Sequence, residues 1–373
     1  MRISFTKENL IHALSMVSGV TGKNINLPIL NNILIKAEGN KVEISATNLE
    51  QAVVVTVRAK IEEAGSFTVP ARTVLDVVSL FNGDTINFSI KENELIVTCG
   101  KTSSKIKGVS AEEFPVIPTF PEGKGFLVPA AELKGGLLSV LSSAAKNDIR
   151  PELAGIFCGF DSKNKSLTLA ATDSYRLAEK KIKLEQGEGE EKIIIPARAA
   201  QEISHILTEG KEENKEKSAR IMMGDNQIMV VYNNAQVISR LVEGQYPDYT
   251  QIIPKDFITT VTTDTEKFIK EMKGAGLFTT SGVNSVTLKI DAKSGIMEVS
   301  STSNQTGEYR SELPVEVKGE DNLVLINNRY VLDGMNNMNS TELQIKIING
   351  DTACVFTPKG SNDYLYIVMP IRQ

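Results

Sequence analysis

A threefold internal repeat constrains the fold of this chain more than any other feature of its sequence. A segment of alternating apolar and polar residues, the pattern of a β-strand, ends at Thr47, Thr172 and Thr302. These threonines are 125 and 130 residues apart in a chain of 373 residues. The spacing predicts three successive copies of one structural unit.

Two independent markers repeat with the same period. A strand-like segment runs directly into a helix-like segment once in each copy, at Arg72, Arg198 and Arg329. An aromatic residue or a methionine precedes a proline near the end of each copy, at Pro115, Pro247 and Pro370. Because three unrelated patterns agree, the repeat is a property of the whole chain.

Proline, glycine and charged residues interrupt the pattern at residues 118–124 and 254–256. We therefore predict three similar domains, covering residues 1–122, 123–255 and 256–373. Each opens with a short strand and a segment of helical periodicity, at residues 8–17, 134–145 and 265–274. Several strands, the helix at the arginine marker and more strands follow. Two helices among many strands predict an α+β fold with antiparallel sheets.

Composition excludes several classes of protein. The 41 lysines and arginines against 46 acids give a net charge of −5, so any nucleic-acid binding requires a local basic surface. Two histidines and three cysteines, none in a metal-ligand spacing, predict no metal and no cofactor. The cysteines lie in apolar strand-like segments, typical of buried thiols in a reducing compartment. With no signal peptide and no membrane span, we expect a cytoplasmic location.

The sequence lacks the usual catalytic motifs, including a GxxxxGK[ST] phosphate loop, HExxH and GxSxG. Asp173 follows a predicted strand, where an aspartate more often forms a turn than acts as a general base. From the residues alone, two classes remain. One is a non-catalytic β-rich repeat protein that assembles through sheet edges, and the other is an enzyme with a site near Asp173.

Several segments of this sequence occur in the same order and with the same spacing as in members of one known family. They are residues 171–178, 244–249 and 366–372, together with 17–19 and 27–30 near the start. Over its whole length the chain resembles the bacterial replicative sliding clamps, the beta subunit of DNA polymerase III. The resemblance implies a non-catalytic processivity factor. Two chains would form a head-to-tail ring of six domains, with helices lining a hole that encircles duplex DNA, and would tether the replicative polymerase and other DNA-processing proteins.

Helix packing supports two chains for each ring. Six helices packed about 8–10 Å apart close a circle only about 19 Å across between axes. Subtracting roughly 10 Å for the helix bodies leaves a hole of about 9 Å, too narrow for a duplex about 20 Å wide. Twelve helices leave a hole of roughly 28 Å.

A sliding ring must attract phosphates without reading bases. We expect lysines and arginines on helices and adjacent loops to do this, and those at the arginine marker are the strongest candidates because the repeat places them equivalently. The alternative for each is a solvated helix face. The candidates are Lys23, Arg72, Lys134, Lys146, Arg150, Arg198, Lys270, Lys273 and Arg329.

The resemblance also implies a pocket between the second and third domains, where the polymerase, the clamp loader and other partners insert a short apolar peptide. Its expected residues are Leu153, Thr172, Ser174, Tyr175, Arg176, Leu177, Pro247, Ile252, Ile367, Met369 and Pro370, with Arg372 at the edge. The alternative is that these residues form core under a C-terminal strand. Because family members often have Gly-His at Ser174-Tyr175 and an arginine at Gln251, we expect a different rim and peptide preference.

Ring closure would join a strand edge of the first domain to the third domain of the other copy. We place this joint at Lys101, Lys105, Ile106 and Lys107 on one side, and at Leu277 and Phe278 on the other.

Overall fold

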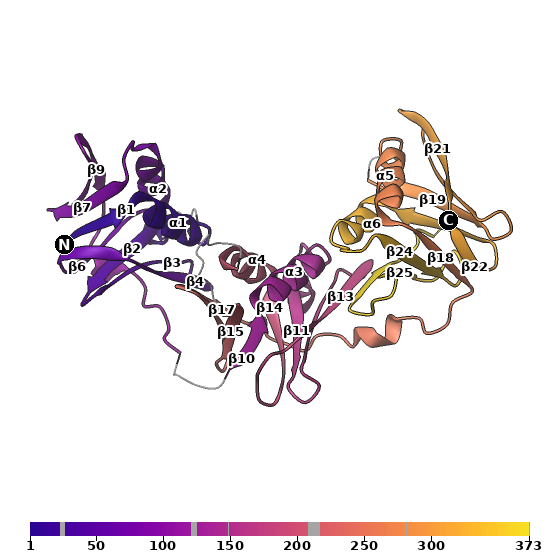
Figure 1. The fold of residues 1–373 in the computed structure, drawn as a ribbon, viewed down its shortest axis with the longest axis horizontal. Helices are drawn as coiled ribbons and strands as arrows, with labels where there is room; N and C mark the ends of the chain where they lie inside the picture. The colour runs from indigo at the N-terminus through magenta and orange to yellow at the C-terminus, as the bar shows by residue number, and fades with distance from the viewer. Residues whose placement is uncertain (23–26, 121–124, 148, 208–216, 281, 373) are drawn as a thin grey trace. The chain divides into compact units, whose positions relative to one another are not determined.

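The computed structural model describes residues 1–22, 27–120, 125–147, 149–207, 217–280 and 282–372 (Figure 1). The chain forms two compact units. The first contains Met1–Lys134, Leu184–Glu188 and Arg198–Leu241. The second contains Gly135–Lys183, Gly189–Ala197 and Val242–Gln373.

The first unit holds a five-stranded and an eight-stranded sheet. The smaller has the order β5 (Ala59–Glu63), β1 (Arg2–Thr6), β7 (Thr85–Lys91), β8 (Glu94–Cys99), β9 (Thr102–Lys107). The larger has the order β10 (Phe126–Pro129), β15 (Ser218–Met223), β16 (Gln227–Tyr232), β17 (Ala235–Arg240), β4 (Gln51–Val57), β3 (Lys41–Thr47), β2 (Asn32–Glu38), β6 (Gly65–Pro70).

The second unit holds a nine-stranded and a four-stranded sheet. The larger has the order β14 (Glu190–Pro196), β11 (Gly155–Asp161), β12 (Ser166–Thr172), β13 (Arg176–Lys183), β26 (Tyr364–Val368), β25 (Cys354–Pro358), β24 (Glu342–Ile347), β18 (Thr259–Asp264), β22 (Glu316–Gly319). The smaller has the order β21 (Gly307–Pro314), β20 (Ile296–Ser303), β19 (Ser285–Asp291), β23 (Asn322–Asn327).

Among the described residues, the α-helices are α1 (Lys7–Ser18), α2 (Ala71–Leu80), α3 (Ala130–Leu141), α4 (Ala197–Ile206), α5 (Thr265–Gly276) and α6 (Asn328–Met335). In α1, Leu10, Leu14 and Val17 share one face and are buried, so this face packs against β3 and β4. The Asp264 carboxylate accepts the Lys267 N–H at 2.8 Å and so caps the start of α5. None of these helices is long and apolar enough to cross a membrane.

The predicted α+β architecture is confirmed, and the strand pairs of the described chain are antiparallel. One predicted helix is displaced. The helix expected at residues 134–145 begins four residues earlier, at Ala130, and ends at Leu141. It begins directly after Pro129, where β10 ends, as α2 begins directly after Pro70.

The two large sheets cross the repeat boundaries. In the first unit, β4 of the first copy pairs with β17 of the second copy, and in the second unit β13 pairs with β26 of the third copy. We call these pairings the first and second junctions. Each joins neighbouring copies through backbone hydrogen bonds, which the repeat alone did not predict.

The predicted buried thiols are present, since Cys99, Cys158 and Cys354 are buried and free. Burial raises the pKa of Cys354 to about 12, so this thiol stays protonated and unreactive at neutral pH.

Candidate functional site

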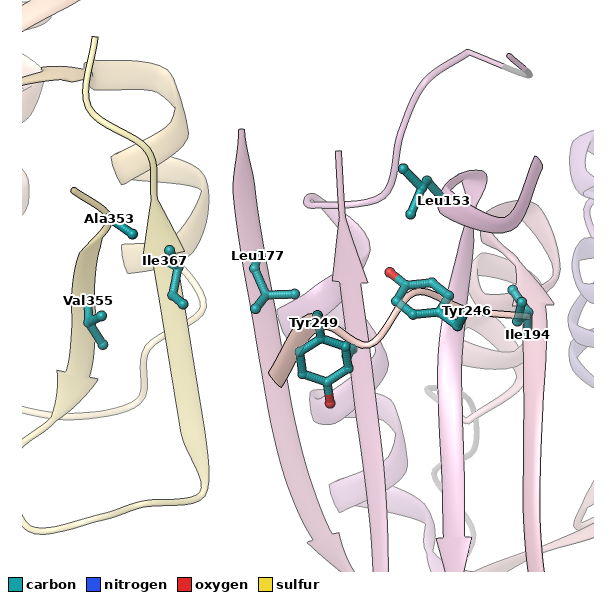
Figure 2. Close-up of a cluster of buried hydrophobic side chains, with 9 residues drawn as sticks. Leu153, Leu177, Ile194, Tyr246, Tyr249, Ala353, Val355 and Ile367 are labelled. Carbon is teal, nitrogen blue, oxygen red and sulfur yellow. The ribbon is translucent and has the colours of Figure 1, made fainter. Parts of the chain in front are cut away.

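A cluster of buried apolar side chains lies at the second junction (Figure 2). Leu177 on β13 is opposite Ile367 on β26, and Ile367 is opposite Val355 on β25. These three side chains form a row across the sheet because paired residues point to the same face. The second-junction cluster consists of Leu153, Ala170, Leu177, Ile194, Tyr246, Tyr249, Ala353, Val355 and Ile367.

The segment after β17 adds two tyrosines to the cluster. The rings of Phe157 and Tyr246 lie 5.4 Å apart, and those of Tyr246 and Tyr249 lie 6.3 Å apart in an edge-on arrangement. The Tyr249 hydroxyl donates a 2.6 Å hydrogen bond to the Glu179 carboxylate. Burial, and then this hydrogen bond, raises the pKa of Tyr249 above its ordinary value. Both tyrosines were missing from the predicted set, although Tyr246 precedes the proline marker in the sequence.

A tight turn links β12 to β13 at the edge of the cluster. The Asp173 carboxylate accepts the N–H groups of Tyr175 and Arg176, each at 3.0 Å. The Thr172 hydroxyl donates to the Arg176 carbonyl oxygen at 2.6 Å, and Ser174 has a φ of 76°. The turn role expected for Asp173 is therefore confirmed.

Arg176 is held by its neighbours. Its guanidinium forms ion pairs with Asp173 and Asp333 and lies 4.5 Å from the centre of the Tyr330 ring. Burial alone lowers the pKa of Arg176, but hydrogen bonding to Asp333 and the other nearby groups give a net rise. This side chain is therefore a rigid, charged support of the turn.

The predicted pocket residues divide into core and rim. Leu153, Leu177 and Ile367 belong to the cluster, and Met369 packs against it. Thr172 and Arg176 are buried beside it. The others lie outside this core. Pro370 is half-buried, and the exposed residues are Ser174, Tyr175, Pro247, Ile252 and Arg372.

Two large apolar residues are exposed on the rim of the second-junction cluster. Tyr175 and Ile252 are 62% and 51% exposed. The Met369 N–H donates to the Tyr175 carbonyl oxygen at 2.8 Å and fixes the C-terminal segment against the turn.

The three arginines of the repeat occupy the same local position. Arg72, Arg198 and Arg329 are each the second residue of a helix, namely α2, α4 and α6, and all three are exposed. None forms an ion pair with another described residue within 4 Å. Their charges are therefore available to a ligand.

The other predicted DNA contacts are less uniform. Lys134 lies in α3 and is half-buried, while Lys270 and Lys273 lie in α5 and are exposed. Lys146 and Arg150 are exposed in the segment after α3. Lys23 lies outside the described residues.

The predicted joint falls on one sheet edge and beside another. Lys101 precedes β9, the edge strand of its sheet, and Lys105 and Lys107 of β9 are exposed, but the Ile106 side chain is only 4% exposed and belongs to the core. Ile106 therefore offers its backbone and not its side chain to a joint. Leu277 is 73% exposed, and the Phe278 ring stacks 6.1 Å from Tyr309 of the edge strand β21. The β21 edge was not among the predicted residues.

Among the described residues, histidine, cysteine and acidic side chains do not form a group of three or more that could hold a metal ion.

Comparison with known proteins identifies the family. Models of the N-terminal, central and C-terminal domains of the DNA polymerase III beta subunit match residues 1–118, 128–248 and 250–372. The beta sliding clamps of Synechocystis sp. and Staphylococcus aureus are 26% and 25% identical to this chain, covering all of it and 99% of their own lengths.

Solved structures agree with the fold. The DNA polymerase III beta subunit of Thermotoga maritima has a TM-score of 0.92 and 25% identity, and covers 100% of this chain and 99% of its own. The Bacillus subtilis sliding clamp has a TM-score of 0.93 at 24% identity, with the same coverage. A Pseudomonas aeruginosa sliding clamp bound to griselimycin has a TM-score of 0.92 at 23% identity, with full coverage of both chains.

The three domain matches cover nearly the whole chain in the order of the repeat. Proteins of this family are processivity factors without catalytic activity, which excludes an enzyme with a site near Asp173. The chain belongs to the DNA polymerase III beta subunit family and has its three-domain α+β clamp fold.

Proposed function

We propose that this protein is a DNA sliding clamp in which two copies close head to tail into a ring around duplex DNA and tether the replicative polymerase. The domains of each copy would be residues 1–122, 123–255 and 256–373. Family membership supports the general function, and the geometry of each site supports the roles proposed for its residues.

The recurrence of Arg72, Arg198 and Arg329 carries the DNA-binding part of the proposal. A ring that slides needs equivalent cations spaced around its hole, each attracting a phosphate without a base contact. Three exposed arginines at one position of a repeated helix meet this need. Lys134, Lys270 and Lys273 would add to the field from α3 and α5, and Lys146 and Arg150 from the segment after α3. Lys23 remains a further candidate.

The second-junction cluster and its rim would bind the peptides of partners, including the polymerase and the clamp loader. An apolar side chain of a peptide could pack on Tyr175, Ile252 and Met369, whose surfaces are already partly desolvated. The thioether of Met369 adapts to side chains of different shape.

The joint between copies would extend a sheet across the two chains. The strands β9 and β21 both lie at sheet edges within the described chain, so each has backbone groups free to pair with another strand. Exposed Leu277 and half-buried Phe278 lie beside β21 and would supply the apolar centre, with Lys101, Lys105 and Lys107 around it. We further propose a cytoplasmic location, which suits the buried free thiols.

The test compares retention on nicked circular and linear DNA after loading by a clamp loader, at high salt. Salt weakens phosphate contacts steeply, whereas a closed ring is retained on a circle by topology. We expect the protein to remain on the circle, to slide off linear DNA, and to leave the circle once a nuclease opens it. Equal loss from both substrates would refute encirclement and favour a β-rich repeat protein that assembles through sheet edges.

A further inference from the structure

The first junction has the same strand register as the second. At the second junction, paired positions on β13, β26 and β25 carry Leu177, Ile367 and Val355. At the first junction, paired positions on β4, β17 and β16 carry Ala52, Ile238 and Met229. The first junction is therefore a structural copy of the surface to which we assign partner peptides.

The turns beside the two junctions confirm this alignment. Leu49 has a φ of 75°, and Ser174, in the same place, has a φ of 76°. Their N–H groups donate to the hydroxyls of Thr47 and Thr172, at 3.0 and 3.1 Å. Since residues other than glycine rarely adopt positive φ, the recurrence of this turn fixes which residues are equivalent.

Two equivalent positions carry smaller side chains at the first junction. Ala52 occupies the position of Leu177, and Leu34 occupies that of Phe157. Ile117 and Phe120 of the linker at residues 111–120 pack against Ala52, Met229 and Ile238, and a cavity of about 1250 Å³ remains beside them. This exceeds the roughly 300–1,000 Å³ of a typical small-molecule site and suits several residues of a peptide.

The walls of the cavity are largely apolar and adaptable. Met222 and Met229 are paired on neighbouring strands, and methionine side chains repack readily around different ligands. The first-junction groove is defined here by Leu34, Met222, Met229, Ile238, Ile117 and Phe120.

The charged groups of the lining are mostly cationic. Lys36, Lys217 and Arg220 line the cavity against one carboxylate, that of Glu43. Lys36 pairs with Glu38 at 2.7 Å, but Lys217 and Arg220 form no ion pair with another described residue, and both are exposed. A ligand with negative charge next to apolar groups would complement this lining.

We propose that the first-junction groove is a second binding site, which takes a short segment of a partner protein with acidic residues next to apolar ones. The acidic residues lie at Arg220 and Lys217, and the apolar side chains enter the cavity beside Met229 and the linker. The inference rests on the cavity, its charge and its register, and it holds whether or not the second-junction cluster binds peptides.

Methionine methyl groups provide a separate reporter for each site. Full-length protein carrying ¹³C-methyl methionine is titrated with a capped peptide of two aspartates followed by alternating leucine and phenylalanine. Met222 and Met229 report on the first-junction groove, and Met369 reports on the second-junction cluster. Leucine substitutions at Met222 and Met229 assign the signals.

Charge reversal at the exposed Arg220 tests the role assigned to the cations. We expect the signals of Met222 and Met229 to move in a saturable way, with Arg220→Glu weakening this binding at least tenfold. Arg220→Lys should keep most of the affinity. Arg58→Glu, which makes the same charge change at an exposed arginine outside the cavity, should leave it unchanged. A peptide with asparagines in place of the aspartates should bind about tenfold more weakly.

Three outcomes would overturn the proposal. Movement of Met369 alone would place the peptide only at the second junction and leave the partner-pocket assignment intact. Equal binding by wild type and Arg220→Glu would remove the acidic requirement. Changes at Met222 and Met229 that follow protein concentration without peptide would identify a second copy of the chain as the occupant.

Discussion

Replacing Arg72, Arg198 and Arg329 together by glutamine tests whether the repeated helix position contacts DNA. The three side chains are exposed and have no ion pair within the described chain, so their loss should not disturb the fold. What should change is the dependence of DNA affinity on salt.

The size of this change follows from the number of arginines. Each phosphate contact contributes about 0.9 to the slope of log affinity against log salt, so three arginines contribute up to about 2.7 for each chain. Over a fourfold rise in salt, from about 50 to 200 mM, a slope of about 2.7 corresponds to a roughly 40-fold loss of affinity. The triple variant should lack this part of the salt dependence.

Fluorescence anisotropy of a labelled short duplex at several salt concentrations measures the slope. The matched control replaces Arg2, Arg58 and Arg240 by glutamine, which removes the same charge at exposed positions on or beside strands. We expect a shallower slope only for the helix variant. If both triple variants show the same slope, the arginines act through net charge and the reasoning is wrong.

Three further predictions concern the fold that supports these sites. Tyr249→Phe removes the 2.6 Å hydrogen bond to the Glu179 carboxylate, so the free energy of unfolding measured by urea denaturation should fall by about 1–3 kcal/mol. An unchanged free energy of unfolding would contradict this role. Leu177→Ala removes a fully buried side chain and should lower the free energy of unfolding by about 2–5 kcal/mol. Ile252→Ala, at a half-exposed position, should lower it by less than about 0.5 kcal/mol. Equal losses would place Leu177 outside the core. Burial raises the pKa of Glu202, so the stability of the wild type falls as pH rises from the ordinary glutamate range through this raised value. Glu202→Gln should therefore melt above the wild type at pH 8 and close to it at pH 4, and a difference independent of pH would show that the carboxylate does not titrate in this way.

The sequence alone determined the local structure of the repeat. The strands ending at Thr47 and Thr172 and the helices beginning one residue before Arg72 and Arg198 lie where their patterns placed them. Such elements depend on residues close together in the chain, through alternation of apolar residues and prolines that end strands. The family resemblance led us to expect a partner pocket at the second junction, where three of the expected residues belong to one cluster.

The contacts that complete the sites were decided by tertiary structure. Tyr249 reaches Glu179 across 70 residues of sequence, and Arg176 reaches Asp333 across 157. No local pattern encodes these pairs, because each joins side chains from elements that are far apart in the sequence. For the same reason Ile106, an apolar residue in a charged segment, could not be assigned to the core before its sheet was known.

The cavity at the first junction shows the division most clearly. The sequence contains Ala52 and Leu34, but only the register of β2, β3, β4 and β17 places them where the second junction has Leu177 and Phe157. The sequence specifies the size of each side chain, whereas the space between side chains depends on how distant strands pair. Local periodicity therefore determined the elements, and long-range pairing decided which surfaces are filled and which stay open.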